Sequence, residues 1–253
     1  MSPAPIPHAF AVDQLELGNA LYNQRRYAEA EAEYREAVKI DPKLARARSG
    51  LGDALHRQKQ VAEAAAEYEE AKRIGPNDAN THNGLGNLLY EQKKYAEAET
   101  EYREALRLDP NYAKAHNGLG SILSEQKKYA EAKTEYQEAL RLDPDYAIAH
   151  SNLGSVLGKQ KKYVEAETEY RAAIKIDPND ADTHRNLGNL LYEQKKYAEA
   201  ETKYREALRL DPNDAKAHNG LGNVLNSLKK HAEAEAEYRE ALRLDPNNAI
   251  THC

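Results

Sequence analysis

Residues 79–112 read ANTHNGLGNLLYEQKKYAEAETEYREALRLDPNY, and this stretch decides the fold. Its first half, up to the Lys93-Lys94 pair, repeats leucines at the three- and four-residue spacing of one helix face. Its second half places tyrosine, alanine and leucine on one face and glutamate and arginine on the other. Asp109-Pro110 ends this second helix, because a residue before proline is pushed out of the helical region. The stretch therefore predicts two amphipathic helices.

The same pattern recurs every 34 residues. The proline that ends the unit is found at Pro42, Pro76, Pro110, Pro144, Pro178, Pro212 and Pro246. Columns of glycine and tyrosine keep the same interval from Gly18 and Tyr34 onward. A fixed period of this length is typical of stacked supersecondary units that share their cores only with their neighbours. We expect an all-α array of seven antiparallel helix hairpins.

The period also sets the expected domain boundaries. We expect a flexible, proline-rich leader over residues 1–10, the array over residues 11–248 and the start of a truncated eighth repeat over residues 249–253. The seven predicted repeats are 11–44, 45–78, 79–112, 113–146, 147–180, 181–214 and 215–248.

Composition restricts the possible partners and location. The chain has a net charge of -6 and no long run of lysine or arginine, which disfavours nucleic acid as a partner. No stretch is as apolar as a secretory signal or a membrane span, so we expect a cytoplasmic protein that does not bind membranes. The single cysteine, Cys253, excludes an internal disulfide framework.

A glycine inside each predicted first helix needs a packing reason, because it costs about 1 kcal/mol relative to alanine. Small residues usually let two helices approach closely. We interpret Gly86 and Ala98 as the contact that sets how tightly a hairpin closes.

These residues resemble the tetratricopeptide repeat family. The resemblance rests on Leu85-Gly86, Ala98, Tyr102, Ala105 and Pro110 and covers about nine tenths of the chain. It implies a right-handed superhelical solenoid.

The chain departs from the family pattern in two columns. The family's early tryptophan is replaced by histidine, which we interpret as a wedge between helices, and its inter-helix glycine is replaced by lysine. The lysines are expected to hold a left-handed backbone. The histidines are His82, His116, His150, His184 and His218, and the lysines are Lys93, Lys127, Lys161 and Lys195.

No constellation of residues indicates catalysis. The sequence has no Ser/His/Asp or Cys/His set and no glycine-rich phosphate loop. The histidines of successive repeats are expected about 8–10 Å apart, one helix spacing, which is too far to share a metal ion. We therefore expect neither an enzyme nor a metal site nor a cofactor.

The face of each first helix opposite the leucines carries amides, tyrosines and mixed charges. In the resembling family this face lines a concave groove that holds an extended peptide or a partner's helix. Asn152 and Asn186 occupy a column where relatives of the O-linked N-acetylglucosamine transferase carry an asparagine ladder, although four other repeats have glycine there. The predicted groove residues are Asn19, Tyr22, Arg57, Asn83, Asn87, Tyr90, Lys114, Asn152, Arg185, Asn186, Asn189, Tyr192, Lys216 and Asn223.

These observations favour a non-catalytic protein–protein interaction scaffold whose partner is a protein or peptide. Asparagines would bond the ligand backbone, tyrosines would pack its side chains, and Lys114, Arg185 and Lys216 would select acidic groups. The lysine, asparagine and arginine set with which co-chaperones of the family grip a C-terminal carboxylate is incomplete here. Two alternatives stay open: a structural module that self-associates through uncapped terminal repeats, and the substrate-recruiting arm of a larger enzyme.

Overall fold

The computed structural model describes residues 7–246, which form fourteen α-helices and no strand. The expected all-α class is confirmed. Within residues 7–246 no helix is both long and apolar enough to cross a membrane. The helices are α1 (Pro7–Asn23), α2 (Tyr27–Ile40), α3 (Ala45–Arg57), α4 (Val61–Ile74), α5 (Ala79–Glu91), α6 (Tyr95–Leu108), α7 (Ala113–Glu125), α8 (Tyr129–Leu142), α9 (Ala147–Lys159), α10 (Tyr163–Ile176), α11 (Ala181–Glu193), α12 (Tyr197–Leu210), α13 (Ala215–Ser227) and α14 (His231–Leu244).

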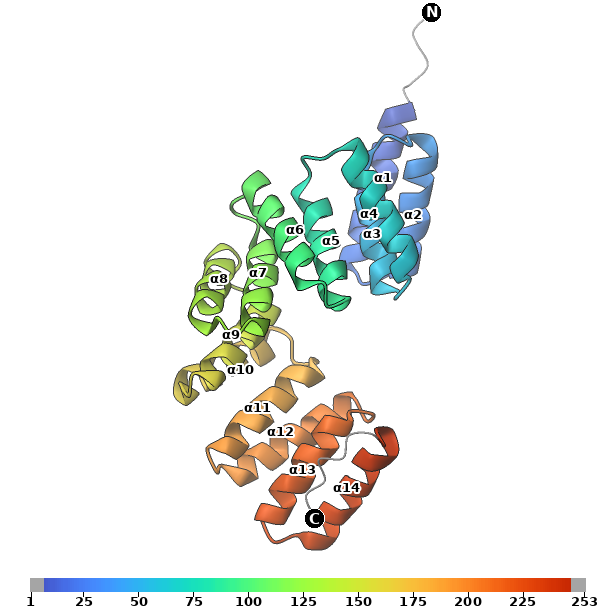
Figure 1. The fold of residues 1–253 in the computed structure, drawn as a ribbon. Helices are drawn as coiled ribbons and strands as arrows, with labels where there is room; N and C mark the ends of the chain where they lie inside the picture. The colour runs from blue at the N-terminus through green and yellow to red at the C-terminus, as the bar shows by residue number, and fades with distance from the viewer. Residues whose placement is uncertain (1–6, 247–253) are drawn as a thin grey trace, which may run out of the picture. The chain divides into compact units, whose positions relative to one another are not determined.

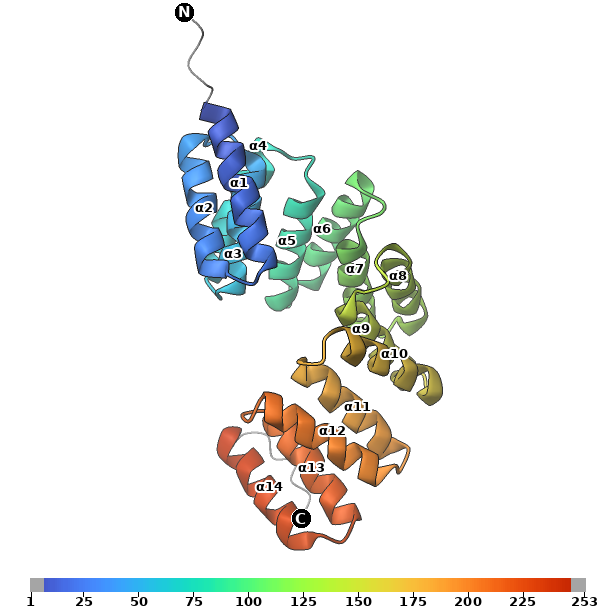
Figure 2. The same ribbon diagram turned by 180° about the vertical axis from the view of Figure 1, so that it is seen from behind.

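The chain forms two compact units, residues 1–126 and residues 127–253. In the first unit, drawn from blue to green in Figure 1, each helix from α1 to α7 packs on the next, and α1, α3, α5 and α7 also contact in succession. In the second unit α8 to α14 pack in the same way, and α9, α11 and α13 contact in succession. The reverse view in Figure 2 shows the same consecutive hairpins within each unit. The predicted stack of antiparallel hairpins is therefore present in both.

Most helix starts coincide with the predicted repeat starts. The first helices of repeats 2 to 7 begin at Ala45, Ala79, Ala113, Ala147, Ala181 and Ala215. Helix α1 differs, because it begins at Pro7. Residues 7–10, expected in the flexible leader, are thus helical; proline at the start of a helix is favourable since its missing N–H is not needed there. Residues 249–253, the expected eighth repeat, lie outside the described part of the chain.

The turn inside each hairpin has one residue in the left-handed conformation, which is Arg25 in the first hairpin and lysine in the others. Lys93 has φ of 60°. Its N–H donates to the Tyr90 carbonyl at 2.9 Å, and the N–H of Lys94 donates to the Leu89 carbonyl at 2.9 Å. These two bonds form a Schellman motif, which usually has glycine at its left-handed position. Lysine therefore holds a strained backbone at this turn.

Tyrosine fills the space beside the repeated glycines. A Cβ atom on Gly86 would lie 2.7 Å from Cε1 of Tyr102, which corrects the interpretation that Gly86 packs against Ala98. Ala98 is fully buried, but the tyrosine ring is the group next to the glycine. Gly118 of the following repeat flanks the same ring, with its Cβ position 2.3 Å from Cε1. The ring thus lies between two glycines, one from its own repeat and one from the next.

Candidate functional site

A hollow of about 570 Å³ lies in the second unit between α11, α12 and α13. We call it the second-unit hollow. Its wall combines amides, two tyrosines and one charge of each sign. It is lined by Asn189, Tyr192, Glu193, Tyr204, Lys216, Asn219, Gly220 and Asn223.

The first unit contains a counterpart of about 490 Å³, the first-unit hollow. Each of the eight residues above has an equivalent here, five repeats of 34 residues earlier in the chain. These equivalents are Asn19, Tyr22, Asn23, Tyr34, Arg46, Ser49, Gly50 and Asp53. Five further residues complete the lining, namely Leu15, Glu16, Asp78, Asn80 and Lys114. The same kind of hollow is therefore built twice, once in each unit.

The buried tyrosines fix the amides of both hollows. The hydroxyl of Tyr34 donates to Oδ1 of Asn19 at 2.9 Å, and that of Tyr204 donates to Oδ1 of Asn189. Because each amide oxygen accepts this bond, the amide NH₂ group is held in one orientation. Neither NH₂ group has a hydrogen-bond acceptor among the described residues. These amides are oriented donors, suited to a carbonyl or carboxylate oxygen of a ligand.

Equivalent cations stand on the first turn of the following helix in both hollows. Arg46 of α3 and Lys216 of α13 are exposed, and neither forms an ion pair within residues 7–246. Lys114 supplies a second cation to the first-unit hollow and is likewise without an ion pair there. An exposed, unpaired cation at a hollow can attract an acidic group of a ligand over several ångströms.

The hollows differ in charge at two equivalent positions, because the second-unit hollow has Glu193 in place of Asn23 and Asn223 in place of Asp53. The hydroxyl of Tyr68 donates to Asp53 Oδ1 at 2.6 Å, and Nδ2 of Asn80 donates to Oδ2 at 3.1 Å. Burial raises the pKa of Asp53, although these two hydrogen bonds oppose that rise. In the second-unit hollow the Oδ1 of the neutral Asn223 accepts from the hydroxyl of Tyr238 at 2.8 Å. Among the equivalent positions, the carboxylate thus lies at a different place in each hollow.

A half-buried tyrosine forms the rim of each hollow. The ring of Tyr22 meets Tyr27 edge-on with centroids 5.3 Å apart, and Tyr192 lies 5.6 Å from Tyr197. Nε of Arg57 donates to the hydroxyl of Tyr22 at 3.3 Å. Burial is the main cause of the raised pKa of Tyr22. These ring pairs leave one tyrosine edge at the hollow as a platform for an apolar side chain.

The structure brings half of the predicted groove residues together. Asn19, Tyr22 and Lys114 line the first-unit hollow, with Arg57 bonded to its rim, and four others line the second-unit hollow, namely Asn189, Tyr192, Lys216 and Asn223.

The remaining predicted residues line neither hollow. Asn87 accepts from the hydroxyl of Tyr102 at 2.8 Å, and burial raises the pKa of the nearby Tyr90 to about 12. Asn152 and Asn186 are half-buried in the column where other repeats have glycine. Asn83 is only 5% exposed, and its Oδ1 has no hydrogen-bond partner among the described residues. Asn83 is thus a core residue, because its side chain is covered within the hairpin stack.

Arg185 is not a free cation. Its Nη1 lies 2.5 Å from Oδ2 of Asp214 and its Nη2 lies 2.6 Å from Asp182. The Arg185 and Asp214 side chains are 17% and 9% exposed. Asp214 also caps α13, accepting from the backbone N–H groups of Lys216 and Ala217. Arg185 therefore joins α11 to the start of α13, and the expectation that it selects acidic ligand groups is not supported.

Sequence reasoning left out several residues of the hollows. Tyr34 and Tyr204 belong to the tyrosine column on the predicted apolar face and were not proposed as groove residues, yet they line the hollows and orient the amides. Asn219 was not proposed, although its Oδ1 is buried without a partner among the described residues. The available signal was the spacing of 15 residues that separates each column tyrosine from a polar residue on the preceding helix.

Sequence profiles identify the family. A profile described as Tetratricopeptide repeat matches residues 15–79 and 185–249, a second with the same description matches residues 145–213, and one described as TPR repeat matches residues 86–127 and 120–161. The chain therefore belongs to the tetratricopeptide repeat family, whose fold generally serves as a protein-interaction scaffold. A search of curated protein sequences gives no match.

Solved structures of low sequence identity share the fold. A chain of the APC/C hetero-tetramer Cut9-Hcn1 superimposes with a TM-score of 0.80 at 22% identity, covering 85% of this chain and 43% of its own length. Pseudomonas aeruginosa pilF gives a TM-score of 0.69 at 24% identity, covering 80% of this chain and 92% of pilF. YrrB, described as a TPR protein with an unusual peptide-binding site, gives 0.54 at 24% identity, covering 72% of this chain and 93% of YrrB. The present chain thus spans less than half of the Cut9-Hcn1 chain.

Proposed function

We propose that this chain is a non-catalytic interaction scaffold that binds an extended peptide or a partner helix, with the two hollows as anchor points. The observation that carries the proposal is the repetition of one hollow in both units. Each copy presents an oriented amide, a tyrosine edge and an unpaired cation. This combination suits a main-chain carbonyl, an apolar side chain and an acidic group of one peptide.

The expected ligand is acidic at the second-unit hollow. Lys216, on the first turn of α13, is exposed and unpaired within residues 7–246, whereas Glu193 is the last residue of α11. A peptide with an acidic side chain beside Lys216 and a main-chain carbonyl at the NH₂ group of Asn189 would contact both residues at once. The peptide-binding site named for YrrB supports the same kind of ligand for this fold.

The proposal is tested with peptides selected from a displayed random 12-residue library on the parent protein. Replacement of an interface anchor commonly costs more than about 1 kcal/mol of binding free energy, so Tyr192→Ala and Lys216→Ala should each weaken the selected peptides about tenfold. Lys203→Ala, on α12 and outside the hollow, is the charge-matched control. The Lys216→Ala variant should also lose most of the salt dependence of binding.

Two results would contradict the proposal. Selected peptides that bind Tyr192→Ala and Lys216→Ala as tightly as the parent would place binding elsewhere. A library that yields no binder, together with sedimentation of the parent as concentration-dependent stacks, would favour a self-associating structural module.

A further inference from the structure

Three histidines close the joints between successive repeats with hydrogen bonds from both ring nitrogens. Nδ1 of His82 lies 2.6 Å from Glu101 on α6, and its Nε2 lies 3.0 Å from the carbonyl oxygen of Pro76 in the α4–α5 loop. His82 itself is on α5 and 4% exposed. One side chain thus ties the loop after one repeat to both helices of the next. The ring lies between helices, as expected of a wedge, and polar contacts also hold it there.

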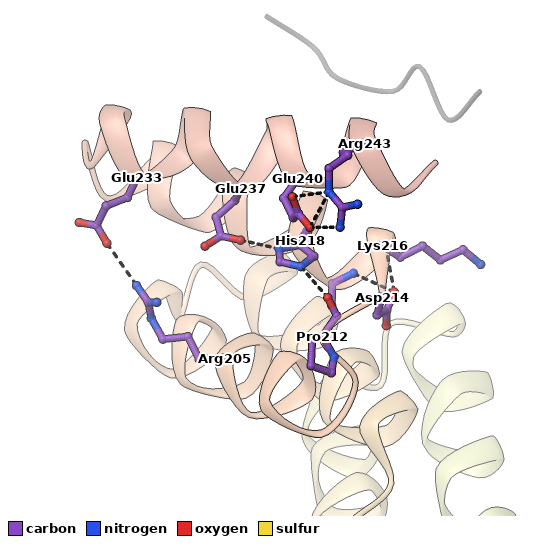
Figure 3. A network of polar contacts seen from close by, with 10 residues as sticks. Arg205, Pro212, Asp214, Lys216, His218, Glu233, Glu237, Glu240 and Arg243 are labelled. Carbon is purple, nitrogen blue, oxygen red and sulfur yellow. Dashed lines mark hydrogen bonds and ion pairs between the residues drawn. The ribbon is translucent and has the colours of Figure 1, made fainter. Parts of the chain in front are cut away.

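The same arrangement recurs twice in the second unit. His150 lies 2.6 Å from Glu169 and 3.0 Å from the Pro144 carbonyl. Figure 3 shows the last copy, in which His218 lies between Glu237, at 2.6 Å, and the Pro212 carbonyl, at 3.2 Å. We call the three His–Glu–Pro sets the histidine clamps.

Both neighbours of each ring are acceptors, and this fixes the protonation that the clamp needs. A carbonyl oxygen and an ionised carboxylate can only accept hydrogen bonds, so both ring nitrogens must carry a proton. A neutral imidazole has one N–H and leaves one of the two bonds unmade. The clamp is complete only as an imidazolium ion paired with a carboxylate.

Two other repeats show the same requirement through different residues. In the second repeat Arg48 occupies the histidine column and donates from Nε to the Pro42 carbonyl at 3.2 Å and from Nη1 to Glu67 at 2.8 Å. In the sixth repeat the column position of the glutamate is Lys203, and Nδ1 of His184 has no hydrogen-bond partner among the described residues. Arg48, which stands beside the carboxylate of Glu67, thus donates two N–H bonds. His184, which lacks a carboxylate at the equivalent position, does not form the clamp.

Charged groups on the neighbouring helices act on the His82 ring. Near His82 these are Glu101 and Glu104 on α6 and, opposing them, Lys72 on α4. The hydrogen bond to Glu101 raises the pKa of His82 above its ordinary value of 6.5. Burial opposes ionisation of Glu101, but hydrogen bonds from His82 and Lys72 outweigh burial and lower its pKa.

The neighbours of the other two clamps are also acidic. His218 faces Glu237 and Glu240 on α14, the latter paired with Arg243, and His150 faces Glu169 on α10.

We propose that the histidine clamp at His82 is a pH-responsive closure of its repeat joint, shut at mildly acidic pH and released as the pH rises. Since the His82 pKa is raised on folding, its contribution is complete below pH 6.5 and is lost as the pH rises through the higher folded value. The contribution of Glu101 is present above pH 4.5 and is lost as the pH falls below it. The clamp at His82 is therefore strongest between these two values, and release loosens the loop that links one repeat to the next.

The test compares the parent with H82R, which copies the natural Arg48 arrangement and keeps the closure charged at every pH. Between pH 6 and pH 8.5 the parent Tm should fall by about 2–4 °C more than that of H82R. Equal pH dependence of the parent and the H82R variant would overturn the proposal.

A second measurement on the parent does not depend on any variant folding. Nitrogen-15 NMR of the histidine rings at pH 6 should find both nitrogens of His82 protonated. Amide exchange in the loop after Pro76 should quicken at pH 8.5 beyond the intrinsic change, with the loop after Pro178 as the internal reference. A neutral His82 ring at pH 6 would overturn the proposal.

Discussion

A Cβ atom added to Gly118 of α7 would lie 2.3 Å from Cε1 of Tyr102 on α6. Tyr102 is only 2% exposed, and Gly86 occupies the other side of its ring, so the ring cannot move away. The space that each glycine leaves is thus occupied by an aromatic side chain of a neighbouring helix. Packing, and not backbone freedom, requires glycine at this position, since its φ is an ordinary helical one.

Gly118→Ala should therefore destabilise the array despite the better helix propensity of alanine. Overpacking of a filled core commonly costs about 1–3 kcal/mol, which exceeds the gain of about 1 kcal/mol from replacing glycine in a helix. Chemical denaturation measures the difference. Gly158→Ala is the matched control, because its Cβ would lie 3.3 Å from a flexible terminal methyl group of Leu190. Equal unfolding free energies for the two variants would refute the packing argument.

Tyr34→Phe should test the bond that orients Asn19. The hydroxyl donates to Oδ1 of Asn19 at 2.9 Å, and a hydrogen bond of this type contributes about 0.5–1.5 kcal/mol net. A double-mutant cycle with Asn19→Ala isolates the pairwise part, which should have the same size. A coupling free energy of zero would mean that the tyrosine does not orient this amide.

Lys93→Gly should stabilise the chain. The left-handed conformation costs a non-glycine residue about 1–2 kcal/mol, partly offset by the larger backbone entropy of glycine in the unfolded chain, so a gain of about 0.5–1 kcal/mol is expected. Lys93→Ala keeps the Cβ atom and removes the charge. It should show no gain, and a gain equal to that of the glycine variant would point to charge instead of backbone strain.

Arg185→Ala should cost several times more than Arg243→Ala. Arg185 joins Asp182 and the capping residue Asp214 at a half-buried site, where removing one partner costs about 3 kcal/mol. The exposed Arg243–Glu240 pair contributes at most about 1 kcal/mol. Thermal denaturation at low and high salt distinguishes them, because salt screens only the exposed pair effectively. Equal costs would contradict the structural role given to Arg185.

The 34-residue period of the sequence predicted most of the fold. Leucine spacing and the prolines predicted every helix pair, because each 34-residue unit repeats the same local signals. The partner of Gly86 could not be predicted in the same way, since the choice between Ala98 and Tyr102 depends on how the two helices are rotated. That rotation is set by packing against the next repeat, which a single repeat does not contain.

The site was less predictable than the fold. Residue type and helix face placed Tyr192, Lys216 and Asn189 on the predicted groove, and these three residues line one hollow. They did not show that Arg185 is paired with Asp214, the N-cap of α13, or that Asn83 is buried. The Arg185–Asp214 contact joins residues 29 positions apart, where helix periodicity gives no information.

The tyrosine between two glycines also determines how this array can be divided. Removing a repeat removes the glycine that packs on one side of the tyrosine ring of the repeat before it. The hairpins are therefore not independent units. The residue 16 positions after such a tyrosine, as Gly220 follows Tyr204, must leave room for the ring, and this column holds asparagine at Asn152 and Asn186. A chimera or deletion should therefore keep each tyrosine together with the residue that follows it in this column. Loss of one end hairpin must therefore weaken the adjacent one, and fraying should travel inward hairpin by hairpin.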